Sequence, residues 1–336
     1  MKIALKISFL LFFFISYLTY AQGDGPESHF LKPQKMWGLN IKYLNLNQNM
    51  SVNGDLLTPN LNLEINSFPI TLFHVFSIKG QHAEIVAMMN PTSISSTLDL
   101  PNPLEDRVFD KTAFSDGFIG LKVGMVNGKA ISLEDYMKGK INFTMMSYFR
   151  IWYSGSYDKD ELVNIGTNRT TFEYGIPTTM SLWSKGNSST NLELFPSIRF
   201  FTKNKDVLVN PVSNASVERT QAPLFVFENH IIHNFNKKLR ATLNGRYQVG
   251  GQTTTDGSKD GNSFNNYGAT IGLGYQLHPL IYLHADYGGI VFGGGEAESN
   301  MFRFNLQLNY LKIKKINSHE QAKIYNHFII NLFRFM

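Results

Sequence analysis

Apolar and polar residues alternate along segment after segment of this chain, and the alternation is clearest near the C-terminal end. In 301–310, every second residue is large and apolar, whereas the residues between them are Arg303, Asn305, Gln307 and Asn309. Successive side chains of a β-strand point to opposite faces, so this segment has one apolar face and one polar face. The pattern predicts a strand whose two faces meet different surroundings.

The same alternation recurs often enough along the chain to predict twelve strands. After the N-terminal stretch, no segment offers the run of about 18 apolar residues that a membrane-spanning helix needs. The predicted strands lie near 37–43, 66–78, 81–89, 119–125, 143–153, 172–176, 192–200, 223–235, 239–249, 267–277, 281–287 and 301–310.

The connections between these strands differ in length in a regular way. Long connections are expected at 47–62, 90–115, 154–166, 203–222, 251–265 and 293–300. Connections of the other parity include short turns at 79–80, 236–238 and 278–280, and two longer exceptions at 127–141 and 184–190. Outer-membrane barrels have long extracellular loops and tight periplasmic turns. The chain is therefore predicted to form an all-β, transmembrane, antiparallel up-and-down barrel of about twelve strands.

The N-terminus has the features of a secretory signal peptide. Lys2 and Lys6 precede a short apolar stretch at 9–18, and Ala21 ends a sequence that resembles a cleavage site. A positive start, a short apolar run and a small-residue site are typical of cleaved signals. The expected organisation is a signal peptide at 1–21, a periplasmic N-terminal segment at 22–35, the barrel at 36–310 and a tail at 311–336. The tail fits either a capped helix or an added strand.

Composition narrows the possible functions. The formal net charge is +5, but the signal peptide and the tail carry the excess of Lys and Arg, so the body of the chain is nearly neutral. A near-neutral body gives no support for nucleic-acid binding. Cysteine is absent, which removes disulfides, thiolate nucleophiles and Cys-ligated metals. Aromatic residues make up 13% of the chain, which suits the aromatic girdles of a membrane barrel.

The charged side chains of the predicted strands lie on the polar parity. A Lys or Arg facing lipid at the middle of the membrane costs about 2–4 kcal/mol, so these side chains are expected in the lumen. Asn168 and Arg169 stand where an extracellular loop enters a strand, and they fit either a structural turn or ligand and loop-docking contacts at the pore mouth. The candidate lumen and ligand residues are Arg150, Asn168, Arg169, Glu173, Arg199, Arg240, Arg246, His284, Asp286 and Arg303.

One pair among these candidates has the residue types of a catalytic site. His284 and Asp286 share a face one pleat apart, and a carboxylate can orient an imidazole for general-base work. No serine on a matching strand completes a triad, so a hydrogen-bonded lumen network with Arg246 and Arg303 is the expected role. The sequence predicts no catalytic residue, no metal site and no cofactor.

Several motifs resemble those of the family known as the putative meta-pathway of phenol degradation. The most specific is Asn164-Ile165-Gly166-Thr167-Asn168-Arg169, followed by Glu173 and Gly175; Thr170 stands where the family usually has Trp. The weaker motifs are Gly25-Pro26, the 200–206 loop, Gln221-Ala222-Pro223 and Gly250-Gly251-Gln252-Thr253. The resemblance covers roughly 25–310. It implies an outer-membrane channel or transporter-like barrel for hydrophobic or aromatic compounds.

The expected function is passage of a small hydrophobic or aromatic solute across the outer membrane of a Gram-negative bacterium, without enzymatic activity. The expected partners are the lipid bilayer and such a solute, and no nucleic acid. Two alternatives remain open at this point. One is an outer-membrane lipid-modifying enzyme that uses His284, and the other is a structural or adhesion barrel whose long loops bind partners.

Overall fold

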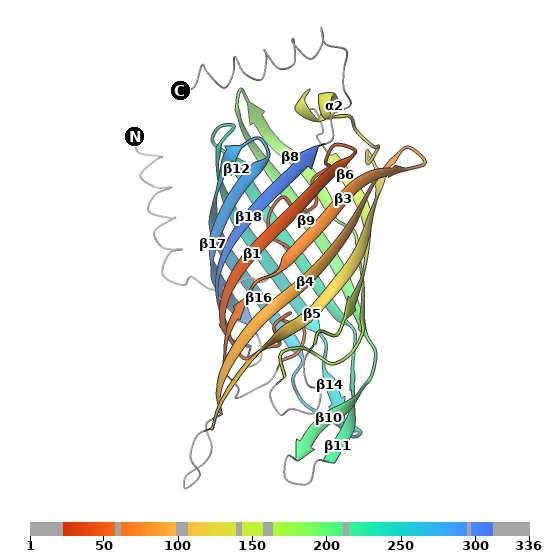
Figure 1. The fold of residues 1–336 in the computed structure, drawn as a ribbon, viewed down its shortest axis with the longest axis vertical. Coiled ribbons are helices and arrows are strands. Elements are labelled where there is room, and N and C mark those ends of the chain that lie inside the picture. The colour runs from red at the N-terminus through yellow and green to blue at the C-terminus, as the bar shows by residue number, and fades with distance from the viewer. Residues whose placement is uncertain are drawn as a thin grey trace.

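A computed structural model shows a closed antiparallel barrel of twelve strands, which confirms the predicted fold (Figure 1). The structure describes residues 23–57, 62–98, 107–138, 143–156, 164–210, 215–293 and 297–311. The expected signal peptide lies outside these residues, and so does the tail beyond Leu311. In the described part of the chain, no helix is long and apolar enough to cross a membrane.

Most passes across the barrel wall are single strands. They are β1 (Met36–Gln48), β4 (Gln81–Leu98), β5 (Arg107–Val126), β6 (Phe143–Tyr153), β9 (Ser188–Phe201), β12 (Leu224–Asn234), β13 (Leu239–Gly250), β16 (Phe264–His278), β17 (Ile281–Gly293) and β18 (Ser299–Leu311). Each pairs with its neighbours in antiparallel register, and β18 closes the barrel by pairing with β1 from Met36–Leu311 to Gln48–Ser299.

Two passes are interrupted by a proline, which lacks the N–H that a strand ladder needs. Pro69 separates β2 (Asn62–Ser67) from β3 (Ile70–Ile78), and Pro177 separates β7 (Thr171–Gly175) from β8 (Thr178–Lys185). The carbonyl of each proline still accepts a hydrogen bond from the neighbouring strand. Lys42 N–H donates to Pro69 O at 3.0 Å, and Met146 N–H donates to Pro177 O at 2.9 Å. The wall therefore stays continuous across both interruptions.

The two faces of the wall follow the alternation in the sequence. On β5, Ile119 and Leu121 face outward and are 53% and 39% exposed, whereas Lys122 faces the lumen and is 4% exposed. Arg150 of β6 and Arg246 of β13 are likewise buried in the lumen. An apolar outer band and a polar interior are the expected arrangement for a barrel in lipid.

The expected connections differ from the structure at the extracellular end, which is the lower end of Figure 1. The expected loop at 90–115 is mostly strand, because β4 continues to Leu98 and β5 begins at Arg107. The β4 extension has Ser and Thr on both faces, and the β5 extension has the charged neighbours Asp110 and Lys111 on opposite faces, so the apolar alternation that marks a lipid-facing strand is missing there.

Two further expected loops contain extracellular strands. β10 (Asn204–Asn210), β11 (Ala215–Gln221), β14 (Thr253–Thr255) and β15 (Ser258–Lys259) form a four-stranded sheet outside the barrel. At the opposite end, the connection at 127–141 contains the short helix α2 (Leu133–Lys138), and the expected loop at 184–190 is a tight turn between β8 and β9. Short strands with polar residues on both faces lack the alternation of apolar and polar residues from which the membrane strands were predicted.

Gly38 of β1 lies where the lumen leaves no room for a side chain. A Cβ built at Gly38 would overlap the ring of Phe73, which is buried with Met36 and Val75. We expect Gly38→Ala to lower the free energy of unfolding by about 1–3 kcal/mol, measured by urea unfolding in lipid vesicles. In the double variant Gly38→Ala/Phe73→Ala, the loss of unfolding free energy should be smaller than the sum of the losses in the two single variants, because removal of the ring leaves space for the methyl group. Fully additive costs would contradict this explanation.

Candidate functional site: the occluded lumen

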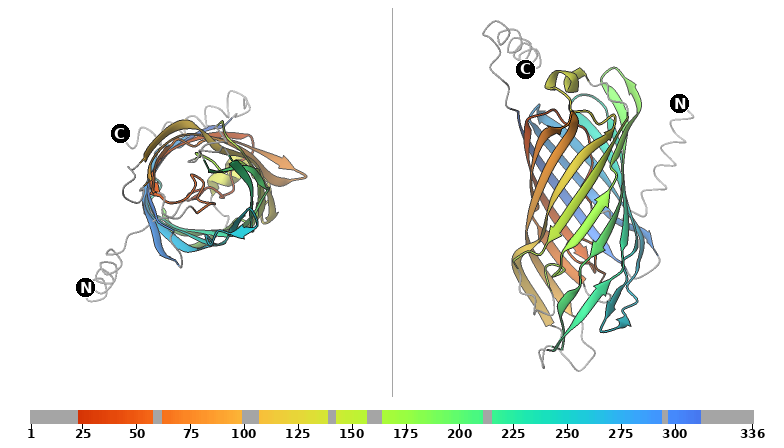
Figure 2. Two further views of the ribbon diagram at one scale, coloured as in Figure 1. Left: turned by 90° about the horizontal axis from the view of Figure 1, so that it is seen from below. Right: turned by 90° about the vertical axis from the view of Figure 1, so that its right-hand side faces the viewer.

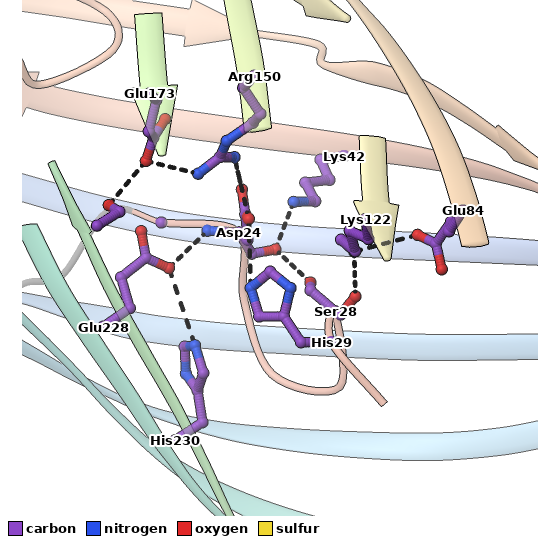
Figure 3. Close-up of polar contacts among 12 residues, drawn as sticks. Asp24, Ser28, His29, Lys42, Glu84, Lys122, Arg150, Glu173, Glu228 and His230 are labelled. Atoms are coloured by element: carbon purple, nitrogen blue, oxygen red, sulfur yellow. Dashed lines mark hydrogen bonds and ion pairs between the residues drawn. The ribbon is translucent and has the colours of Figure 1, made fainter. Parts of the chain in front are cut away.

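The chain before the first strand lies inside the barrel. We call residues 23–35 the N-terminal plug; viewed from below in Figure 2, the red part of the chain crosses the interior of the ring of strands. The Asp24 carboxylate accepts two bonds from Arg150, at 2.7 and 3.0 Å, and its backbone N–H donates to Glu228 at 3.0 Å (Figure 3). These contacts place Asp24, in the segment 22–35 that the sequence predicts to be periplasmic, within the lumen.

Lumen side chains from several strands hold the N-terminal plug. Three of these bonds use backbone carbonyls of the plug as acceptors. They are Lys42 Nζ to Asp24 O at 2.7 Å, Lys122 Nζ to Ser28 O at 2.7 Å and Arg303 Nη1 to Gly23 O at 2.9 Å. Side-chain ion pairs add to them, between Glu27 and Arg240 and, at 2.7 Å, between Lys32 and Glu84. The plug is thus fixed around the circumference of the barrel rather than on one face.

Arg150 is the centre of this network. Its guanidinium pairs with Asp24 of the plug and, at 2.8 Å, with Glu173 of β7. Tyr148, Phe118, Trp152 and Phe195 place their ring centres 4.7–5.4 Å from it, so it lies within an aromatic cage. Glu173 also accepts a bond from Trp152 at 2.9 Å and lies 3.3 Å from Arg199. These buried charges compensate one another. If one partner were removed, the remaining charges would stay buried without compensation, which destabilises the folded state.

His29 of the N-terminal plug is fully buried and stays neutral. Its ring packs 4.5 Å from the ring of Phe195, and its Nε2 lies 3.5 Å from the Asp24 carboxylate. Burial, reinforced by the charge of Lys122, holds the pKa of His29 well below its usual range. Burial alone would raise the pKa of Asp24, but Arg150 and the neighbouring cations hold it below its usual range. Both groups therefore resist protonation while the plug is docked.

Acid should weaken docking of the N-terminal plug. A released His29 would titrate near its ordinary pKa of about 6.5, whereas the docked His29 does not, so the released state gains a proton below that pH. The contribution of neutral His29 to docking is fully present above about pH 6.5 and decreases below it. The ratio of open to closed channels should therefore rise as pH falls to 5, by at most about tenfold per pH unit, because one proton is involved. Open probability of reconstituted channels between pH 7.5 and 5 measures this. The His29→Gln variant should lose the dependence, and an unchanged slope would contradict the assignment.

A second segment occupies part of the extracellular half of the lumen. We call residues 49–57 the extracellular plug; it follows β1 and folds inward. Gln221, Gln248 and Asn262 donate to its carbonyls, at Asp55 O, Gly54 O and Leu57 O, over 2.7–3.0 Å.

Apolar side chains of the extracellular plug fill two buried clusters in the wall. Val52 packs in a cluster with Leu44, Leu46, Leu63, Ile65, Ile94, Ile165 and Met301. Met50 and Leu57 pack in a second cluster with Leu224, Val226 and Phe264. The extracellular half of the lumen thus contains two apolar clusters, and the plug contributes apolar side chains to both.

The most specific motif, at 164–169, docks onto the extracellular end of the barrel. Ile165 is fully buried, and its carbonyl accepts a bond from Ser115 at 2.9 Å. Asn168 has φ 52° and donates to Asn204 at 3.3 Å, and Arg169 contacts Gln221 and stacks on Phe201. The structure places Asn168 and Arg169 in contacts between extracellular loops.

His284 and Asp286 lie together on β17. His284 Nδ1 is 3.2 Å from the Asp286 carboxylate, which also binds Arg303 at 2.7 Å, and His284 Nε2 lies 3.1 Å from Thr242 Oγ1. Asn244 donates to the Thr242 oxygen at 3.3 Å, so the hydroxyl belongs to a longer chain of wall hydrogen bonds. The arrangement is a connected lumen network across β13, β17 and β18.

The structure brings the candidate residues together in three groups. Arg150, Glu173 and Arg199 form the central cluster, Arg240 binds Glu27, and His284, Asp286 and Arg303 form the network on the β17 side. Arg246 lines a small recess beside Gly23 and Glu228 that has no room for a solute.

Sequence reasoning missed the acidic and histidine residues of the plug and several of their wall partners. Glu228 and His230 were detectable, since they lie on the polar parity of β12. The plug residues Asp24, Glu27 and His29 have no periodic signal, because they precede the first strand.

Comparison with known proteins agrees with this architecture. A model of the family described as "Putative MetA-pathway of phenol degradation" matches residues 83–289. An outer membrane channel from Pseudomonas putida F1 superposes with a TM-score of 0.63 at 15% identity, covering 86% of this chain and 99% of that chain. The transport unit of the autotransporter AIDA-I from Escherichia coli gives a TM-score of 0.45 at 9% identity, covering 87% and 93%. A search of curated proteins returns no significant match.

Proposed function

The chain belongs to the family described as "Putative MetA-pathway of phenol degradation", and from this premise we propose that it is a gated channel for small hydrophobic or aromatic solutes. Its fold is that of an outer-membrane barrel. The observation that carries the proposal is the filled lumen. Two segments, the N-terminal plug and the extracellular plug, occupy the interior without joining the strand ladder of the wall.

The way both plugs are held supports reversible opening. Most of their contacts are side-chain hydrogen bonds, ion pairs and apolar packing, and the backbone bonds to residues outside the plugs lie at the plug ends next to β1, at Gln34, Lys35 and Asn49. Either plug can therefore leave while the ladder of the barrel stays intact. Each individual bond contributes only about 1 kcal/mol net, or somewhat more where charged. A closed resting state with rare openings follows from many such bonds acting together.

The chemistry along the lumen supports a solute that is apolar and aromatic. From the extracellular side, the solute would first meet the apolar clusters that the extracellular plug now fills. It would then meet the layer of cations around Arg150, and guanidinium groups bind the faces of aromatic rings. The apolar cluster that contains Phe73 adjoins this layer, because its members Phe118 and Trp152 also belong to the aromatic cage of Arg150.

Reconstitution of the mature chain into liposomes tests the proposal. We expect uptake of a small aromatic solute such as toluene derivatives above that of protein-free liposomes, and little uptake of a sugar of similar mass. Deletion of 23–33 should increase single-channel conductance in a planar bilayer, since it removes the N-terminal plug and keeps β1 whole. Aromatic uptake equal to that of protein-free liposomes, for both the full chain and the deletion variant, would refute the proposal. The two alternative functions, an outer-membrane lipid-modifying enzyme and an adhesion barrel, remain predictions from the sequence.

A further inference from the structure

Exposed lysine side chains lie around most of the periplasmic end of the barrel. Each lies at or next to a turn that joins two strands, or at the start of β1. We call them the lysine ring, and they are Lys35, Lys79, Lys129, Lys185, Lys237 and Lys238. All six are exposed, and none of them has a carboxylate partner within 4.0 Å among the residues that the structure describes.

The lysine ring follows most of the circumference of the barrel, and among the described residues only the arc of β16, β17 and β18 has no lysine. In the order of strands around the wall, Lys35 precedes β1, Lys79 joins β3 to β4 and Lys129 follows β5. Lys185 then lies between β8 and β9, and Lys237 and Lys238 lie between β12 and β13. A protein partner would dock on one arc of this rim, whereas lipid surrounds a barrel on every side.

The depth of the lysine ring is marked by an aromatic belt. Trp37, Trp183, Phe235, Tyr275 and Tyr310 face outward at this end of the strands and are 42–61% exposed. Trp37 lies two residues from Lys35, and Trp183 lies two residues from Lys185. Aromatic belts mark the boundary between the hydrocarbon and the headgroups, so side chains just beyond them reach the phosphate level.

The extracellular end has a different charge arrangement. There Lys203 pairs with Glu218 at 2.7 Å, and Arg219 lies 3.8 Å from Asp260. Exposed carboxylates such as Glu64 and Asp256 stand among these cations. The periplasmic rim also has two exposed carboxylates, Glu134 and Asp135 of α2, so the six lysines still leave an excess of positive charge there.

We propose that the lysine ring binds the phosphate groups of anionic phospholipids in the inner leaflet of the outer membrane. Basic residues next to an anionic lipid surface bind it electrostatically, and the attraction decreases as salt screens it. The ring and the aromatic belt together fix the depth and the tilt of the barrel in the bilayer. This role is independent of what passes through the lumen.

The tryptophans of the aromatic belt make the proposal measurable. The chain has 3 Trp, of which Trp37 and Trp183 face lipid beside the lysine ring, while Trp152 is buried in the lumen. The barrel is reconstituted in vesicles of phosphatidylcholine mixed with phosphatidylglycerol, with a brominated acyl chain on one lipid or the other. Fluorescence quenching then gives the relative association constant of the two lipids near these tryptophans. We expect phosphatidylglycerol to bind several-fold more strongly.

Charge-neutral variants separate the lysine ring from net charge. Lys→Gln at all six ring positions should bring the relative association constant to about one. The matched control, Lys→Gln at the extracellular Lys203, Lys205 and Lys259, should leave it unchanged. Equal quenching by both lipids in the unmodified barrel would overturn the proposal, and so would an equal loss in the control variant. If the six-site variant does not fold, a salt titration of the unmodified barrel decides, because selectivity that is constant between 0.05 and 0.5 M NaCl would overturn it.

Discussion

Replacing Arg150 with methionine is expected to release the N-terminal plug and open the pore. Arg150 is the one side chain that joins the Asp24 carboxylate of the plug to Glu173 of the wall, and it is 1% exposed. Removal of one partner from a buried ion pair typically costs about 3–5 kcal/mol, because the remaining charges lose their compensation. In the docked state, Asp24 and Glu173 would then repel each other. That cost is relieved when the plug leaves, so the ratio of open to closed channels should rise by about 100-fold or more.

Single-channel recording in a planar bilayer measures this ratio directly. The matched control is Arg219→Met, which removes an arginine that lies near Asp260 in the extracellular sheet, away from both plugs. Its open probability should equal that of the unmodified chain. Heat modifiability on gels establishes that the Arg150→Met barrel is folded before it is recorded. A folded Arg150→Met barrel that stays closed would show that Arg150 does not hold the plug.

The fold was predictable because the membrane imposes a period of two on the wall. In β1 the alternation from Trp37 to Tyr43 gives the correct faces, and the parity continues unbroken to Gln48. Beyond Tyr43 its polarity inverts, with Leu44 and Leu46 facing the lumen and the more polar residues facing out. The strand has left the hydrocarbon there, and its apolar side chains bury against the extracellular plug instead. A pattern that assumes lipid outside therefore places such strand ends too early.

Of the candidate site, only the residues on the barrel strands were predictable from the sequence. Arg150, Arg199, Arg240 and Arg303 were placed in the lumen because the lipid face excludes them. What they bind was not predictable, since the partners Asp24 and Glu27 belong to a segment with no periodic pattern. Buried cations in a lumen need carboxylates nearby to compensate their charge, and the Asp and Glu residues just before the first strand are close enough in the chain to do so. That balance of charge is a signal that alternation alone does not contain.

The same reasoning applies to the extracellular plug, where the docking contacts are apolar. Val52 is 4% exposed within the cluster that contains Leu46, Ile65 and Ile165. A carboxylate at this position has no cation within the cluster, and burial of an unpaired charge costs several kcal/mol. Val52→Asp is therefore expected to expel residues 49–57 and to open the extracellular half of the lumen. The Leu44–Leu46 side of the wall would then be free to accept an apolar solute.

Limited proteolysis of intact vesicles measures this exposure. New cleavage within 49–57 should appear in Val52→Asp and be absent in the matched control Asn45→Asp, which adds the same charge to an outward-facing position at the base of the same loop. Conductance should rise modestly in Val52→Asp alone, because the N-terminal plug still closes the centre of the lumen. Conductance of the double variant with Arg150→Met should exceed that of either single variant, since the extracellular plug narrows the path that opens when the N-terminal plug leaves. If Val52→Asp alone opens the channel fully, the N-terminal plug is not a second barrier.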